Sequence, residues 1–573
     1  MATDLSYWER RYSRRGLIAA SGTAAFIAAC GGSNNNQAKS TQAPASGAAP
    51  ATKAAGASGS PAAAAAAPQG QPKNGGVLRY HLPKEPGNLD PHLATDSSTT
   101  AFSDLAYNAL LRFKTGANVD VQSLELEGEL AEKWETPDTQ TVILHIRQGV
   151  KWQNKAPMNG RPFTADDVKW GVPRIGTDKP EFQRATFFKG ISSIDTTDAN
   201  TVVIKQKEPN VPFLTYLAVP YHKMLPREVV EKEGDAKNTM IGTGPFTLES
   251  FTRGGKAVFK KNPDYFKKGM PYLDGVEITG VLEPAARLAA FRANETDLMI
   301  FSKADDADTT KKQVSAVQTE KFTPFFYYMA FGFDVTRGPL QDERVRQAIA
   351  LVIDHPGIRR AIFQDEAVRS MPIPVGFKTW LADPKDLDFY TEKVDVAKAK
   401  QLMEAAGQGA GFKTTMDTNV SYTDEAETMP LLQQMLKQIN IDVTDLKKIE
   451  PAAFLGPTNA PGGFDQRLWR HSAFSEPDEF VTNFYQKGAS RNYGGWGSDQ
   501  LDALIKQQRN LAGATERKKV LIQIQKALAT SNYRIGLEQP YEIVGWYNKV
   551  KGWRALAADP GYYCLPFENT WLA

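Results

Sequence analysis

The chain has 573 residues, too many for one hydrophobic core, so we expect two or three lobes. Hydrophobic residues make up 41% of it and charged residues 23%, which is ordinary for a soluble globular protein. The 68 basic and 65 acidic side chains give a formal net charge of +3, which leaves no electrostatic case for nucleic-acid binding. Two cysteines, Cys30 and Cys564, cannot build a disulfide framework, and Cys564 is expected to be a small buried apolar residue.

The N-terminal residues have the features of an export signal. The sequence SRRGLI at residues 13–18 is similar to a twin-arginine signal, and the apolar run over residues 17–29, about 13 residues long, is too short to span a bilayer. The run ends in IAAC at residues 27–30, which resembles a bacterial lipobox. We therefore expect residues 1–29 to be a cleaved signal peptide and Cys30 to be lipidated; the alternative is a plain secretory signal with an incidental cysteine.

A linker follows the signal. Residues 30–74 consist mainly of Ala, Ser, Gly, Pro, Gln and Asn, with almost no large apolar side chain. Such a segment cannot bury enough surface to offset the entropy of ordering, so we predict a disordered linker that lets the folded part reach over a membrane partner. The alternating sequence GGVLRY at residues 75–80 then predicts the first strand.

Further local signals appear before the middle of the chain. The alternating sequence TVILHIR at residues 141–147 predicts a strand. Thr164 and Asp167 have the spacing of a capping box, which predicts a helix that runs through Trp170.

The most distinctive stretch is IGTGPF at residues 241–246. It predicts a tight turn, because glycine reaches positive φ without a Cβ clash and proline presets φ. The flanking alternation predicts strands over residues 246–251 and 256–260, joined by a hairpin loop at residues 253–255. The sequence KNPDYF at residues 261–266 stops the second strand.

Helices dominate the signals of the second half. Asp342 is expected to N-cap an amphipathic helix that breaks at residues 354–358, where another helix begins. Residues 395–407 predict a capped helix with a glycine after its end, and two late helices are predicted over residues 499–510 and 515–529. Strands and helices alternate along the chain, which predicts the α/β class.

Taken together, these blocks resemble the extracytoplasmic solute-binding proteins of ABC importers, in family 5, the cluster that carries oligopeptides, dipeptides and nickel. The resemblance rests on GGVLRY, LDPH, LAEKWE, GVKW, FTADDV, GTGPF, KNPDYF, VRQAIALVID and DVAKAKQLMEAAG in family order. An insertion at residues 154–160 departs from the family pattern and is expected to lengthen a surface loop. The resemblance implies a two-lobed periplasmic-binding-protein clamp, type II-like, that closes over a solute by hinge motion.

The resemblance also implies a division of the folded part into two lobes and an extra small domain in the first lobe. Lobe I would combine residues 75–106, 224–325 and 540–573, the small inserted domain would be residues 107–223, and lobe II would be residues 326–539. In this division the GTGPF turn would be scaffolding near the hinge and would not contact the ligand.

Enzyme and metal signatures are missing from the sequence. G-x-S-x-G, H-E-x-x-H, a Walker loop and a complete G-x-G-x-x-G do not occur. The six histidines are scattered without metal-ligand spacing, and His145, within a predicted strand, is expected to be structural. We therefore predict no catalytic residue, no metal site and no cofactor.

One predicted site position departs from the family. In the peptide binders a lobe II aspartate holds the amino terminus of the ligand, and aligning this chain on Glu476 puts Ala473 there. An ammonium group in a closed cleft needs an opposite charge, so Ala473 disfavours a peptide with a free amino terminus. The alternative is that Glu476, Asp478 or Asp465 compensates.

The neighbouring side chains suggest other solute contacts. Arg470 and His471 at the cleft rim would suit a carboxylate, a phosphate or a sugar hydroxyl. Only alternate side chains of residues 325–331 can reach a solute, because the others face the core. Tyr493 and Trp496, in a glycine-rich loop, would stack on a ligand or shield it from solvent. The predicted solute contacts are Trp469, Arg470, His471, Phe474, Tyr493, Trp496, Tyr328 and Phe331.

The resulting prediction is a monomeric, lipid-anchored solute-binding subunit of an ABC importer, outside the cytoplasm, in the periplasm or on the outer face of the membrane. Its partners would be a peptide or another small polar organic solute and the permease and ATPase subunits, with membrane contact through the lipid alone and no nucleic acid. Four alternatives remain open: an oligosaccharide or organic-anion binder, a nickel or metal-chelate binder, a sensory binding protein, and a secreted enzyme on the same fold.

Overall fold

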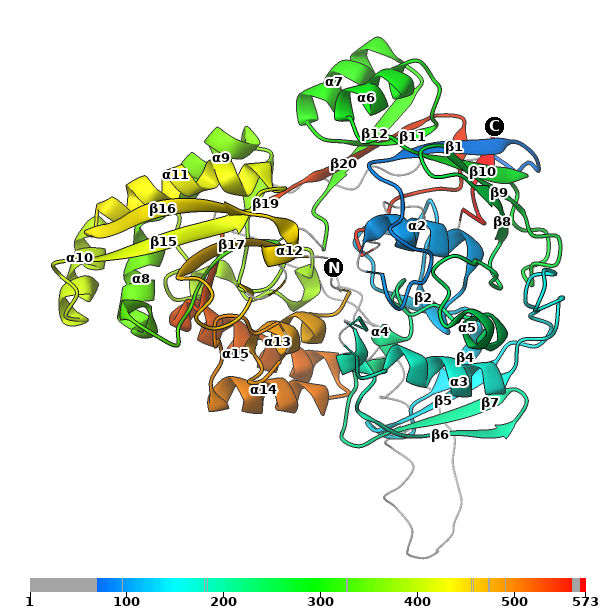
Figure 1. The fold of residues 1–573 in the computed structure, drawn as a ribbon, viewed down its shortest axis with the longest axis horizontal. Helices are drawn as coiled ribbons and strands as arrows, with labels where there is room; N and C mark the ends of the chain where they lie inside the picture. The colour runs from blue at the N-terminus through cyan, green and yellow to red at the C-terminus, as the bar shows by residue number, and fades with distance from the viewer. Residues whose placement is uncertain are drawn as a thin grey trace, which may run out of the picture.

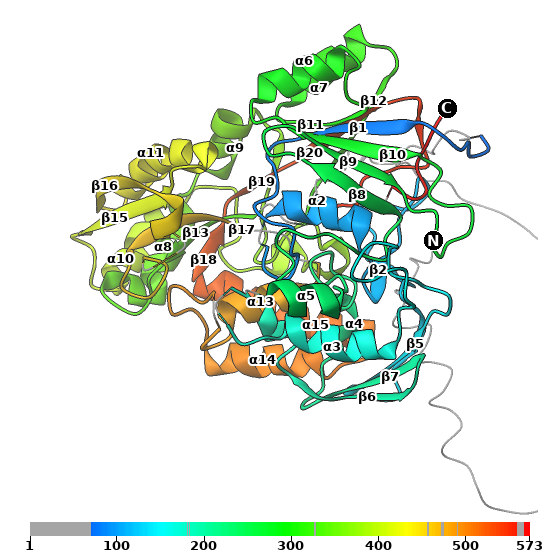
Figure 2. The ribbon, with the colours of Figure 1, turned by 45° about the vertical axis from the view of Figure 1, so that its right-hand side comes forward.

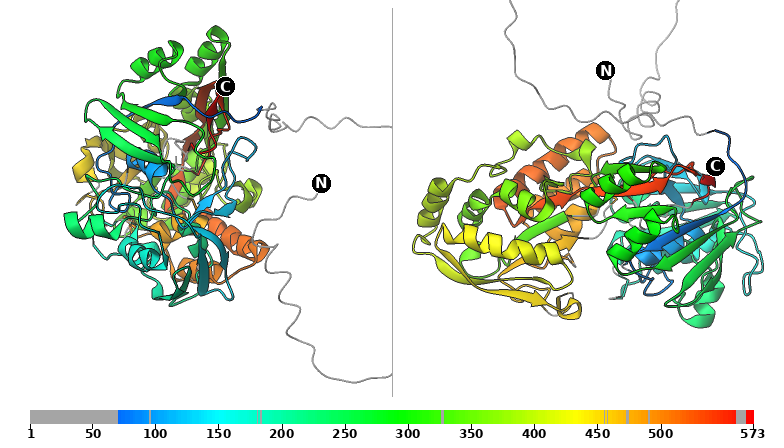
Figure 3. Two further views of the ribbon diagram at one scale, coloured as in Figure 1. Left: turned by 90° about the vertical axis from the view of Figure 1, so that its right-hand side faces the viewer. Right: turned by 90° about the horizontal axis from the view of Figure 1, so that it is seen from above.

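The computed structural model describes residues 70–94, 96–179, 181–182, 184–325, 328–454, 456, 458–471, 475–489, 491–558 and 567–573, with the side chains of Ala452 and His471 left out. The predicted export signal, Cys30, most of the linker and Cys564 lie outside these residues. Two bodies lie side by side, one around a five-stranded sheet and one around a seven-stranded and a four-stranded sheet (Figures 1 and 3). Within the described ranges, no helix has both the length and the apolar character needed to cross a bilayer.

The seven-stranded sheet has the order β12-β20-β11-β1-β10-β9-β8 and draws on both ends of the described chain. β1 runs parallel to β10 and β11, whereas β20 runs antiparallel to both β11 and β12. Helices α6 (Pro284–Arg292) and α7 (Ala304–Gln313) lie above the sheet and α2 (Ser97–Ala106) below it (Figure 2). The strands are β1 (Val77–Leu82), β8 (Phe246–Phe251), β9 (Lys256–Lys261), β10 (Gly275–Gly280), β11 (Leu298–Phe301), β12 (Val317–Phe322) and β20 (Glu542–Tyr547).

The four-stranded sheet is antiparallel, in the order β4-β5-β7-β6. Its strands are β4 (Ala131–Glu135), β5 (Thr141–Ile146), β6 (Ile191–Asp198) and β7 (Thr201–Gln206). Helix α3 (Ala165–Ile175) packs on it and begins with the predicted capping box, in which the Thr164 amide donates to Asp167 Oδ2 at 2.9 Å. Shorter elements around it are β2 (Leu111–Phe113), β3 (Leu126–Gly128), a 3-10 turn (Ala185–Phe187), α4 (Phe213–Tyr216) and α5 (Arg227–Glu233).

The five-stranded sheet has the order β16-β15-β17-β13-β18. One face packs on the apolar sides of α8, α9, α10 and α11, and the other packs toward α13, α14 and α15. Its strands are β13 (Tyr328–Phe333), β15 (Phe412–Asn419), β16 (Ile441–Ile449), β17 (Gln466–His471) and β18 (Arg534–Gly536). The helices are α8 (Glu343–Val352), α9 (His355–Phe363), α10 (Val396–Ala405), α11 (Thr423–Lys437), α12 (Pro451–Phe454), α13 (Pro477–Tyr485), α14 (Asp499–Arg509) and α15 (Ala514–Ser531).

The chain passes between the two bodies twice. It leaves the seven-stranded sheet after β12 and enters the five-stranded sheet at β13, and it returns from β19 (Glu538–Pro540) into β20. β19 pairs with β14 (Ala367–Arg369), which anchors the returning segment. The remaining elements are β21 (Val550–Lys551), β22 (Trp571–Leu572) and 3-10 turns at Pro339–Gln341, Lys378–Trp380 and Pro384–Asp386.

The locally encoded elements are confirmed. The strands predicted around the GTGPF stretch are β8 and β9, and Gly254 in their hairpin loop has a φ of +74°. Asp342 and Asp395 N-cap α8 and α10 as predicted. The helix predicted from Thr164 continues past Trp170 to Ile175.

The predicted reason for the glycines of the GTGPF stretch is wrong. Neither Gly242 nor Gly244 has a positive φ. A Cβ on Gly242 would instead lie 1.9 Å from the carbonyl oxygen of Ala106, and the Gly244 amide donates to that oxygen at 2.9 Å. Close approach to the end of α2 therefore requires these glycines.

Candidate functional site

The carboxyl ends of three parallel strands converge at one edge of the five-stranded sheet. β15 runs parallel to both β16 and β17, and α11 and α13 begin shortly after β15 and β17 end. In open α/β sheets, ligands bind outside the carboxyl ends of parallel strands. This edge is therefore the candidate solute site.

Arg470, near the end of β17, is the central charged group of this edge. Its guanidinium forms a short ion pair with Asp424, lies 3.7 Å from Glu425 Oε1 and stacks 4.8 Å from the ring centroid of Tyr422. Asp424 and Glu425 occupy the first turn of α11, where the helix dipole favours negative charge. The sequence predicted that Arg470 would attract an anion, but two carboxyl groups of the chain already face its charge.

Two nearby carboxyl groups have raised pKa values. Burial raises the pKa of Glu425 to about 8, although Arg470 and the hydroxyl of Thr418, which donates to Glu425 Oε2 at 2.6 Å, both oppose the rise. Burial also raises the pKa of Glu542 to about 7, again opposed by the charge of Arg470. Glu542 begins β20, in the opposite body, so the charge of Arg470 acts on carboxyl groups of both bodies.

Three of the predicted aromatic contacts lie together. Trp469 stacks on Tyr493 with ring centroids 6.2 Å apart and meets Trp496 edge-on at 5.3 Å. Trp496 is fully buried, and its indole N–H donates to the carbonyl of Phe333 at 2.7 Å. Tyr493 is half-buried and is the ring of the three that solvent can reach most easily.

The structure separates two further predicted aromatic contacts, Tyr328 and Phe331. Tyr328 is buried and packs edge-on against Phe480 at 5.1 Å, on the face that also carries Trp469. Phe331 points to the opposite face, because side chains alternate along β13, and it packs against Phe333 at 4.9 Å in the helix-covered core. The two side chains therefore cannot face one solute.

Part of the predicted site lies outside the residues that the structure describes. His471 is placed only by its backbone, which pairs with Tyr328 in the sheet. Phe474 and Ala473 are not among the described residues, so the predicted departure at Ala473 stays a prediction.

The three carboxylates proposed to compensate for Ala473 are all paired within their own body. Glu476 pairs with the buried Arg517, and Asp478 with Arg509 at 2.7 Å. Asp465 pairs with Arg337 at 2.9 Å and also accepts from the amide and hydroxyl of Thr415. The carboxyl groups beside Arg470 are those of Asp424 and Glu425 instead. Sequence reasoning missed them, although two adjacent acidic residues were a visible signal.

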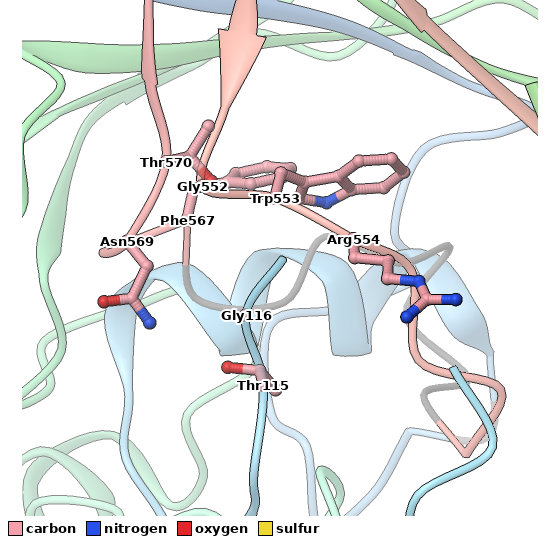
Figure 4. A pocket seen from close by; sticks show the side chains of 8 residues that line it. All are labelled: Thr115, Gly116, Gly552, Trp553, Arg554, Phe567, Asn569 and Thr570. Atoms are coloured by element: carbon pink, nitrogen blue, oxygen red, sulfur yellow. The ribbon is translucent and has the colours of Figure 1, made fainter. Parts of the chain in front are cut away.

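A pocket elsewhere is too small to hold a solute. It lies between residues 115–116 and the C-terminal segment, beside Trp553 and Arg554 (Figure 4). Its volume of about 10 Å³ is the space of a single water molecule. In the described part of the chain, no group of three or more His, Cys, Asp or Glu residues is placed to hold a metal ion.

The protein has two α/β bodies joined by two crossing segments. Charged and aromatic groups lie at the edge of the five-stranded sheet where the parallel strands end. These features define a two-lobed binding protein. Residues 125–492 match the family "Bacterial extracellular solute-binding proteins, family 5 Middle". The chain belongs to this family. It is therefore a solute-binding protein of the kind that serves ABC importers, a family of binding proteins rather than enzymes.

Several named binding proteins are similar to this chain. The chain is 27% identical to the dipeptide-binding protein of Escherichia coli K12 over 433 residues, which cover 70% of this chain and 78% of that one. It is 26% identical to the glutathione-binding protein GsiB of Salmonella typhi over 356 residues, 61% of this chain and 65% of that one. The structure of the DppA periplasmic binding protein of Helicobacter pylori in complex with the peptide STSA superposes on this chain with a TM-score of 0.72 at 23% identity. The superposition covers 87% of this chain and 98% of that one, so the two share the fold.

Proposed function

We propose that the chain captures a peptide or a similar polar organic solute outside the cytoplasm and delivers it to a membrane permease. The observation that carries this proposal is the pairing of Arg470 with Asp424 and Glu425 at the carboxyl edge of the five-stranded sheet. Carboxyl oxygens at this edge can accept hydrogen bonds from a solute that brings an ammonium group, such as the amino terminus of a peptide. The relatives named for dipeptides and glutathione support the same solute class.

We propose the lobe division stated above as the mechanical basis of capture. Lobe I is built around the seven-stranded sheet, the small domain around the four-stranded sheet, and lobe II around the five-stranded sheet. Closing would bring Glu542 toward the carboxyl edge of lobe II.

The experiment is a thermal-shift panel on the full chain with di- and tripeptides, oligosaccharides, organic anions and divalent metals. A solute that binds only the folded state stabilises it by about 2.7 kcal/mol at 100 times its Kd, enough to raise Tm measurably. Peptides should raise Tm, and Asp424→Asn should weaken the shift whereas the exposed Asp442→Asn should not. A shift with oligosaccharides or anions alone would overturn the peptide proposal.

We also propose that Cys30 carries the lipid that tethers the protein to the membrane. The lipobox-like sequence IAAC at residues 27–30 supports this. Cells fed a labelled fatty acid should label the wild-type protein and not Cys30→Ser, and label on both would contradict the proposal.

A further inference from the structure

The small domain and lobe II touch on the side away from the two chain crossings. Helix α4 of the small domain lies beside α13 and α14 of lobe II, whereas β19 and β20 cross at the other side of the molecule (Figure 1). Tyr216 at the end of α4 donates its hydroxyl hydrogen to Asp478 Oδ2 at 2.5 Å. Both side chains are buried, with exposed fractions of 1% for Tyr216 and 0% for Asp478.

Asp478 does not depend on Tyr216 for its charge balance. Arg509, in the same lobe, donates to both of its carboxylate oxygens at 2.7 and 2.9 Å, and Gln508 donates to Oδ1 as well. Burial would raise the pKa of Asp478, but Arg509 and the Tyr216 hydroxyl outweigh burial and lower it. If the lobes separated, the carboxylate would keep its lobe II partners, and Tyr216 would hydrogen-bond to water.

A second contact spans the same junction. The Val211 amide of the small domain donates to the carbonyl oxygen of Arg509 at 3.0 Å. The pair between Lys506 and Glu208, at 3.3 Å, also crosses the junction, but both side chains are mostly exposed and the pair adds little. Of these three contacts, the buried hydroxyl and the backbone amide are therefore the stronger ones.

A hinge motion at the crossings that parts α4 from α13 and α14 would break both contacts, because no chain segment joins these helices nearby. The Tyr216–Asp478 hydrogen bond would form only when the lobes are closed. When the lobes are open, Asp478 keeps its lobe II partners and Tyr216 bonds to water, so neither state leaves a buried polar group unpaired. Such a bond shifts the equilibrium toward the closed state. We propose that Tyr216 and Asp478 form a latch that holds the clamp closed and thereby sets how tightly a solute is kept. They act as positioning residues, since they hold the lobes and do not themselves need to touch solute.

The latch has a quantitative consequence for binding, which rests on the proposed function. The apparent Kd of a clamp rises in proportion as its closed fraction falls. Loss of one hydrogen bond to a charged group lowers the closed-to-open ratio about tenfold. Solute release should accelerate by a similar factor, because the lobes must part before a solute can leave.

The test uses hydrogen exchange on the full chain without any solute, so it does not depend on whether peptides are the ligands. The Val211 amide reports the junction directly. Tyr216→Phe should speed exchange at residues 210–217 about tenfold and leave β15 and β9 unchanged. Unchanged exchange at residues 210–217 would overturn the latch.

The matched control is Tyr265→Phe. Tyr265 donates to the buried Glu568, so this variant removes an equally buried tyrosine–carboxylate bond that does not involve lobe II. It should lower stability without changing exchange at residues 210–217. Equal acceleration in both variants would mean a general loss of stability and would refute the latch. Failure of every peptide to raise Tm would count against the proposed function and leave the exchange result standing.

Discussion

Glu425 offers a sharp test of the electrostatics at the candidate site. Its side chain is fully buried, it accepts from the Thr418 hydroxyl at 2.6 Å, and burial raises its pKa from 4.5 to about 8. Glu425→Gln keeps the shape and an acceptor for Thr418 but removes the ionisable proton. The substitution therefore isolates the cost of ionising this carboxyl group inside the folded protein.

The sign and size of the effect follow from the raised pKa of Glu425. Below pH 4.5 the group is protonated in both the folded and the unfolded chain and has no effect on stability. Between pH 4.5 and about 8 the unfolded chain loses the proton while the folded chain keeps it, so the unfolding free energy falls as pH rises. At pH 9 the folded chain carries nearly the full penalty, roughly 5 kcal/mol. Glu425→Gln should thus be nearly neutral near pH 5 and stabilising by several kcal/mol at pH 9.

The assay is urea unfolding of both proteins at pH 5 and pH 9, followed by tryptophan fluorescence. All other titrating groups are shared, so they cancel in the difference between the variant and the wild type. Glu427→Gln is the matched control, because Glu427 lies exposed on the same helix; its effect should be the same at both pH values. The reasoning is refuted if Glu425→Gln changes the unfolding free energy equally at pH 5 and pH 9.

Two further predictions concern the scaffold. Gly242→Ala should lower the unfolding free energy by about 3 kcal/mol, measured by urea unfolding, because its Cβ would lie 1.9 Å from a backbone oxygen. The control Gly87→Ala, whose Cβ would lie 3.6 Å from the nearest atom, should cost less than about 0.5 kcal/mol. Equal costs would contradict the close-packing explanation. Arg112 and Lys267 more than offset burial and hold the pKa of Glu568 down to about 2, so Glu568→Gln should cost about 3–5 kcal/mol at pH 7. The wild type should lose this stabilisation as pH falls from 4.5 toward 2, and a variant whose deficit is the same at pH 7 and pH 2 would count against it.

Sequence reasoning succeeded where the determinants are local. The hairpin of β8 and β9, the capping box at Thr164 and the N-caps at Asp342 and Asp395 each depend on residues within a few positions of one another. The family could also be predicted from the sequence, because its motifs are short and occur in a fixed order.

The site depended on contacts that no local pattern encodes. Arg470 meets Asp424 across 46 residues of sequence, and Tyr216 meets Asp478 across 262. The alternation rule did state that Tyr328 and Phe331 could not share a face, yet both were predicted as solute contacts. The carboxylates suggested as substitutes for the missing aspartate pair with arginines that come from other elements of the fold, which the sequence alone does not show.

The place of β20 in the seven-stranded sheet constrains how the protein is assembled. β20 lies between β11 and β12, so β12 has no hydrogen-bonded partner in the sheet until residues 542–547 arrive. The first lobe therefore stays incomplete while the whole second lobe is being made. A chain that ends before Glu542 would leave β12 detached and two open strand edges exposed, which are sites for aggregation. Only a chain that extends through β20 can therefore close the seven-stranded sheet.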